Sequence, residues 1–150
     1  MKKFVWRLQR LLGIKIKQEN VMRAELVAVT EQAVAVRGRI MIQKAALRKM
    51  LDELAEKNAK QRMPEQEFFL KYVHVTDEEI KRLELMLDEL EKLRRKKIKE
   101  ILKIRRFRKG LEKLKEKSRA EFMKEQHKDE QNKLDERTTL SYARKIIQHT

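Results

Sequence analysis

Three histidines, His74, His127 and His149, are the side chains of this sequence best suited to general base catalysis or metal binding near neutral pH. They are far apart in the chain, and there is no cysteine to complete a thiolate metal site. A di-iron motif would need a carboxylate three residues before a histidine, but Lys124 precedes His127 at that spacing. Glu130 follows His127 by one helical turn, a pair that a chain with 42% charged residues produces by chance. The histidines therefore predict no metal site and no catalytic pair.

Catalytic loops are also missing from the sequence. It contains neither a glycine-rich phosphate loop nor a G-x-S-x-G elbow, and it has only three glycines in 150 residues. The pattern of apolar residues predicts a thin pair of long helices, and such a pair offers no deep pocket that excludes water. We therefore expect a protein that is not an enzyme and that needs no cofactor.

The composition indicates long helices. One proline, 5% aromatic residues and 42% charged residues leave little material for a globular interior but suit long, paired helices. The spacing of apolar residues in the first third of the chain supports this, because it alternates steps of three and four, as in a coiled coil. The sequence predicts a helix over about 4–58 with this seam: Leu26, Val29, Ala33, Val36, Ile40, Gln43, Leu47, Met50 and Leu54.

The seam lapses before Pro64, a residue that fits the first turn of a helix better than its interior. We therefore predict a turn region over 59–75, which could hold a short helix. Thr76, with Glu79 three residues later, then has the spacing of a capping box. A second long helix is expected from there, over about 77–147.

A stripe of apolar residues continues along this second helix. Folding it back on the first helix predicts an all-α protein: a long, elongated, antiparallel two-helix coiled-coil hairpin that forms a single domain over 1–150. The stripe has the following members: Ile80, Leu83, Leu87, Leu90, Ile98, Ile101, Ile104, Leu111, Leu114, Phe122 and Leu134.

Positive charge is concentrated in residues 91–119, which carry 15 Lys or Arg and 4 Asp or Glu, including the stretch RRFRKGLEKLKEK. A basic zipper would need a leucine repeat after this region, but Ser118 and Glu125 occupy the heptad positions that follow Leu111. Binding of single strands would need several aromatic residues, and only Phe107 is present. We expect no specific nucleic-acid partner. A basic coiled coil that binds nucleic acid nonspecifically, or a membrane surface, stays an alternative.

Three blocks of sequence carry a resemblance to a known family. They are an N-terminal F-x-x-x-L-Q-x-L-L (4–12), RKGLEKLKEK (108–117) and EQNKLDE (130–136). In order and spacing they resemble the FliJ family of flagellar export proteins across nearly the whole chain. Gly110 lies inside the second block, although glycine is less favourable in a helix than most other residues. Its presence suggests a close helix approach or a slight kink.

The resemblance implies a mechanical role. FliJ proteins are cytoplasmic antiparallel coiled coils that resemble the central stalk of rotary ATPases. They bind the hexameric flagellar export ATPase, the export gate membrane protein and export chaperones, which implies a cytoplasmic protein, peripheral at the cytoplasmic face of the inner membrane. The equivalent stalk of a virulence injectisome is a further alternative. The partner-binding residues that the resemblance implies are Phe4, Leu8, Leu11, Leu12, Lys109, Leu111, Leu114, Lys115, Gln131, Leu134, Asp135 and Glu136.

Overall fold

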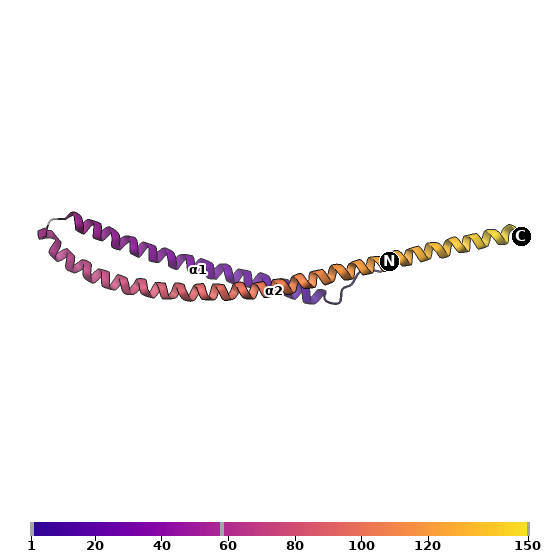
Figure 1. Cartoon of the computed structure of the whole chain (residues 1–150), viewed down its shortest axis with the longest axis horizontal. Helices are drawn as coiled ribbons and strands as arrows, with labels where there is room; N and C mark the ends of the chain where they lie inside the picture. The colour runs from indigo at the N-terminus through magenta and orange to yellow at the C-terminus, as the bar shows by residue number, and fades with distance from the viewer. Residues whose placement is uncertain (1, 58, 150) are drawn as a thin grey trace. The chain divides into compact units, whose positions relative to one another are not determined.

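The structure is a computed structural model that describes residues 2–57 and 59–149, with the side chains of 59–63 excluded. Two helices, α1 (Gln9–Glu56) and α2 (Ala59–His149), pack against each other, and the described residues contain no strand (Figure 1). The prediction of an all-α protein is therefore confirmed.

Helix α1 begins later than the sequence predicted. Residues 2–6 have no regular structure and residues 7–8 form a turn, in which the Gln9 amide donates a hydrogen bond to the Trp6 carbonyl at 3.1 Å. The other end lies close to the predicted end: α1 stops at Glu56, and the Lys57 amide donates to the Leu54 carbonyl at 3.4 Å. The predicted last residue, Asn58, lies outside the described residues. Phe4, Val5 and Trp6, which were predicted to belong to the first helix, therefore lie in a segment without regular structure.

Helix α2 begins much earlier than predicted, and the turn region expected over 59–75 is wrong. The helix starts at Ala59 and continues through Pro64. A proline so near a helix start removes one backbone hydrogen bond, and the neighbouring Lys, Gln, Arg and Met residues favour a helix. Thr76 is not a cap but a helical residue that is only 3% exposed, so the predicted capping box is wrong as well.

Contacts divide the chain into two compact units. Unit 1 contains residues 1–18 and 104–150, and unit 2 contains residues 19–103. Each unit therefore includes a part of α1 and a part of α2. The assignment of one domain to residues 1–150 stays a prediction.

The core of unit 2 lies between its two helical segments. A buried cluster of Val36, Ile40, Ile80 and Leu83 is flanked by partly buried leucines, and burial of each such side chain contributes about 1.5–3 kcal/mol. The seam predicted for α1 is confirmed here, because each of its members is buried or half-buried. In unit 2 the two segments run antiparallel, since residues later in α1 pair with earlier residues of α2: Glu25 with Lys97, Arg37 with Glu91, and Lys44 with Glu84.

Unit 1 buries fewer side chains. Leu12 and Leu111 are its buried apolar residues among the described positions, each about 5% exposed or less. Every residue of α2 from His127 to His149 is exposed. The end of α2 therefore presents its whole surface to solvent within this unit.

Candidate functional site

The histidines do not gather into a site. The His74 Nε2 atom lies 3.4 Å from an oxygen of Glu78 on the exposed surface of α2, and His127 and His149 are exposed. Among the described residues, no group of three His, Cys, Asp or Glu side chains could hold a metal ion. The arrangement around the histidines is that of solvated side chains on a helix surface.

The hollows of the surface are open and shallow. The one near the end of α2 is lined from that helix alone, by Asn132, Asp135, Glu136, Thr139 and Leu140. A groove of about 230 Å³ in unit 2, where α1 ends and α2 begins, has Leu54 and Phe69 among its apolar lining and Glu53 and Glu65 among its charged lining. Its volume is below the roughly 300 Å³ at which small-molecule sites begin. The hollow near the end of α2 is larger, at about 620 Å³, but one helix alone lines it, so it does not enclose a ligand.

The first block of the resemblance (4–12) begins in an N-terminal segment (residues 2–8) that is attached to α2 in unit 1 and ends in the first turn of α1. The ring centroids of Phe4 and Phe122 are 5.5 Å apart with their planes inclined by 51°, a favourable geometry for two aromatic rings. Beside them, Gln126 Nε2 donates a hydrogen bond to the Lys2 carbonyl at 2.9 Å. Phe4 thus has a packing role in addition to the partner-binding role that the resemblance implies.

The leucines of this block are also used in packing. Leu8 and Leu11 are half-buried, and Leu12, the fourth residue of α1, is buried. The Leu12 amide donates to the Leu8 carbonyl at 3.0 Å, which joins the turn to the helix. These side chains position the N-terminal segment, and a partner would meet mainly the polar residues between them.

The second block divides between the two faces of α2. Leu111 is buried and Lys115 is half-buried, whereas Lys109 and Leu114 are exposed. The sequence predicted that Leu114 faces the first helix, and this is wrong, because its side chain is 51% exposed. Lys115 has the inward position instead, since the packed face of α2 follows steps of three and four residues. Of the four partner-binding residues that the resemblance implies in this block, Lys109 and Leu114 are therefore the exposed ones.

The third block is exposed throughout. Gln131, Leu134, Asp135 and Glu136 lie in the part of α2 where every described residue is exposed. Leu134 was predicted to continue the packed stripe, and it does not. All three blocks nevertheless belong to unit 1, because they fall within residues 1–18 and 104–150.

Sequence reasoning missed the polar residues that sit in the seam of unit 2. Lys97 replaces the predicted Ile98 on the packed face, and its Nζ lies 2.8 Å from Glu25 Oε2. On α1, the buried Glu19 carboxylate accepts a hydrogen bond from Arg23 Nη2 at 2.8 Å. The spacing of residues along α2 could have identified these positions. The packed residues of α2 in unit 2 follow steps of three and four: Thr76, Ile80, Leu83, Leu87, Leu90, Arg94, Lys97 and Ile101.

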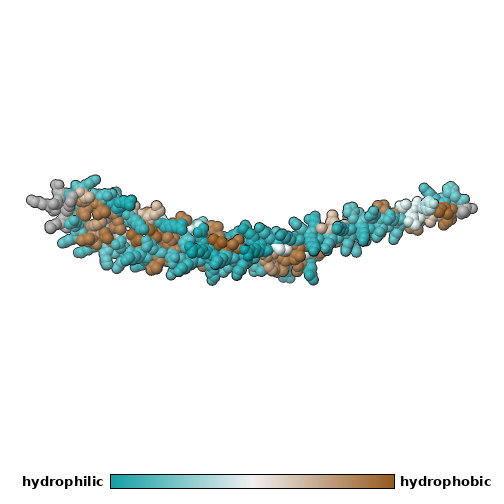
Figure 2. Space-filling view, in the orientation of Figure 1, coloured by the Kyte–Doolittle hydropathy of each residue, from teal (hydrophilic) through white to brown (hydrophobic). Residues whose placement is uncertain are grey.

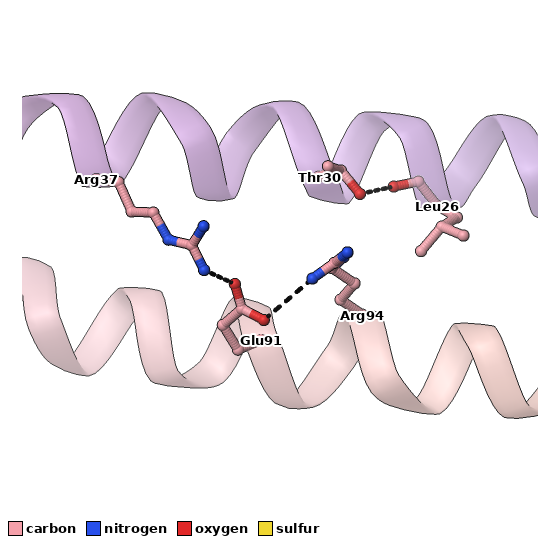
Figure 3. Close-up of polar contacts among 5 residues, drawn as sticks. All are labelled: Leu26, Thr30, Arg37, Glu91 and Arg94. Carbon is pink, nitrogen blue, oxygen red and sulfur yellow. Dashed lines mark hydrogen bonds and ion pairs between the residues drawn. The ribbon is translucent and has the colours of Figure 1, made fainter.

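A further ion-pair group crosses the two helices of unit 2. Figure 3 shows Glu91 of α2 between Arg37 of α1 and Arg94 of its own helix. One Glu91 oxygen pairs with Arg37, and the other lies 3.5 Å from Arg94 Nη1. On α1 nearby, the Thr30 hydroxyl donates to the Leu26 carbonyl at 2.8 Å. The pair with Arg37 joins the two helices and helps to set their register.

The basic stretch of α2 contains one cation–π contact. Lys15 Nζ lies 5.0 Å from the centre of the Phe107 ring, within the range of a favourable interaction. Phe107 is therefore in contact with α1 in unit 1, although its side chain is 48% exposed. Around it, Arg106, Lys109 and Lys113 are exposed, which makes this side of unit 1 strongly cationic.

Neither helix, over its described residues, has a stretch that is both long and apolar enough to cross a membrane. No protein-family model matches the sequence, and neither curated proteins nor solved structures provide a match to this chain. The resemblance to the FliJ family therefore stays a prediction.

Proposed function

We propose that this chain is a non-catalytic central stalk of the flagellar type III export apparatus, a long, elongated, antiparallel coiled-coil hairpin that binds and stimulates the hexameric export ATPase. By the same resemblance, it links this ATPase to the export gate membrane protein and to export chaperones. It works in the cytoplasm, peripherally at the cytoplasmic face of the inner membrane. The stalk itself hydrolyses nothing and transmits the ATPase cycle through its contacts.

One observation supports the proposal most: the three resembling blocks, which come from the two ends of the chain (4–12, 108–117 and 130–136), fall in one compact unit. In that unit the N-terminal segment packs on α2, through Phe4 and Phe122. The exposed members of the blocks, such as Lys109 and Asp135, then belong to the surface of the same unit. A ring-shaped partner could contact such a surface on several sides.

Charge supports a role in binding. Residues 1–18 contain six Lys or Arg and no Asp or Glu, and residues 104–119 contain eight Lys or Arg and two Glu. A surface with this charge attracts acidic protein surfaces and accelerates association, and the effect weakens as salt screens the field. In this proposal the packed leucines stabilise unit 1, and the exposed cations bind the partner.

The experiment is an ATPase assay with the hexameric flagellar export ATPase of the same organism. Addition of the full chain is expected to raise the rate of ATP hydrolysis. Lys109→Glu, which reverses a charge on the cationic surface, should reduce this stimulation without loss of helicity. Lys99→Glu in unit 2 is the matched control, because Lys99 is equally exposed but lies outside the blocks. The proposal would be abandoned if the wild-type chain neither bound nor stimulated the ATPase at low salt.

The same cationic surface favours a second candidate function, binding to a polyanion. A basic coiled coil that binds duplex nucleic acid or an anionic membrane should bind DNA or anionic vesicles at near-physiological salt, with an affinity that falls steeply as salt rises. Such binding, in the absence of any effect on the export ATPase, would favour this second function.

A further inference from the structure

Helix α1 carries a second apolar face that nothing in unit 2 covers. The side chains of Val27, Val34, Met41 and Ile42 lie away from the packed seam, with Val21 at the edge of the same surface, and each is at least 56% exposed. Met41 and Ile42 are both 71% exposed. We call this surface the outer face of α1. Figure 2 shows brown, apolar surface along α1 in unit 2.

A helix that is apolar on all sides is normally buried on all sides, and a contiguous exposed apolar surface marks an interaction site. The outer face spans residues 21–45, roughly 37 Å at 1.5 Å per residue. Between its large side chains lie small residues, which let a second helix come close: Ala24, Ala28, Ala35, Gly38 and Ala45. Helix α2 already covers the opposite side of α1, so the outer face fits a further helix.

Gly38 leaves room on this face for close approach of another helix. It lies in the interior of α1, where a glycine costs about 1 kcal/mol relative to alanine. A Cβ atom added at Gly38 would meet nothing within 4 Å, so the packing within the chain does not require a glycine there. Close approach of another chain at this position would explain it.

The charges on α1 indicate what the other chain is. Between residues 19 and 44, α1 has seven charged residues, and five of them form ion pairs within unit 2. The two that form no ion pair within the described residues are Glu31, in the middle of the outer face, and Arg39, at its edge. They have opposite charges. Glu31 lies four residues before Ala35, and Arg39 lies four residues after it. Two antiparallel copies of this face can therefore pair Glu31 of each with Arg39 of the other.

We propose that the outer face of α1 binds the same face of a second copy of this chain, with the two α1 helices antiparallel about a two-fold axis at Ala35. This axis brings Ile42 level with Ala28 of the second copy, so that a large side chain meets a small one. It also brings Glu31 level with Arg39. Each contact occurs twice, as in any two-fold interface. The proposal does not depend on the proposed stalk function.

The test is sedimentation equilibrium of the full chain over a range from low to high micromolar concentration. The wild type should show a monomer–dimer equilibrium. Val34→Glu and Met41→Glu should weaken the dimer by about tenfold or more, since each buries a charge in the interface. Leu85→Glu is the matched control, because Leu85 is an exposed leucine of α2 in the same unit, and it should leave the equilibrium unchanged.

A charge exchange separates pairing from folding. Glu31→Arg alone and Arg39→Glu alone should each weaken the dimer, and the double variant should restore it, with circular dichroism unchanged in all three. Gly38→Ala should raise the thermal stability of the monomer while weakening the dimer. A wild type that stays monomeric throughout, or a double variant that does not recover, would overturn the proposal. Neither result would affect stimulation of the export ATPase, which tests the stalk function separately.

Discussion

Lys97 Nζ lies 2.8 Å from Glu25 Oε2, although the two residues are 72 positions apart in the sequence. Lys97 occupies a packed position of α2, and its side chain is only 20% exposed. Its methylene stem covers apolar surface while its ammonium group reaches the carboxylate on α1, an arrangement common for lysines at helix interfaces. The pair helps to set the register of the two helices in unit 2, because one residue comes from each.

A charge-exchange cycle tests this pair. Lys97→Glu should destabilise the chain by about 1 kcal/mol, because it places a carboxylate next to Glu25. The double variant Lys97→Glu/Glu25→Lys should regain most of the loss. Urea unfolding followed by circular dichroism measures both. A double variant as unstable as the sum of its single variants would show that the two side chains do not interact.

The core of unit 2 predicts a contrast between two leucines on α2. Leu83 is 7% exposed and Leu85 is 68% exposed. Leu83→Ala should lower the free energy of unfolding by about 2–4 kcal/mol, because it removes buried methyl groups and leaves a cavity. Leu85→Ala should change it by less than about 0.5 kcal/mol. Similar effects of both substitutions would contradict the position of the core.

Gly110 predicts a stabilising substitution. The sequence suggested a close helix approach here, but the residue is exposed, and an added Cβ would meet nothing within 4 Å. Gly110→Ala should therefore raise stability by about 0.5–1 kcal/mol through helix propensity alone. Ala120→Gly, also exposed on α2, should lower it by a similar amount. A loss of stability in Gly110→Ala, measured by thermal unfolding, would mean that the position needs a glycine.

Attachment of the N-terminal segment predicts a fluorescence change. Trp6 is the only tryptophan of the chain, is half-buried, and belongs to the same segment as Phe4, whose ring contacts Phe122. Phe122→Ala should detach the segment, so that Trp6 emission shifts to longer wavelength. Tyr142→Ala, an exposed aromatic of α2, is the control and should leave the emission unchanged. An unshifted spectrum in Phe122→Ala would show that the aromatic pair does not hold the segment.

Much of the fold could be predicted from the sequence because it depends on local pattern. Steps of three and four between apolar residues identified the seam of α1, and its members are buried or half-buried. The scarcity of glycine and proline predicted long helices, and two helices include nearly all described residues. These properties depend on residues only three or four positions apart, so each segment of a helix determines them locally.

The tertiary structure decided which residues of α2 face inward and where α2 begins. Hydropathy favoured Ile98 and Leu114, but the packed positions belong to Lys97 and Lys115, because the position of α1 selects a face of α2 and long lysine stems can lie along it. Thr76 had the sequence of a cap and became a buried residue within the helix. Such choices depend on residues brought together from distant parts of the chain. Local sequence pattern therefore accounts for two long helices and a seam on α1, and the packing of α2 against α1 accounts for the inward positions of α2.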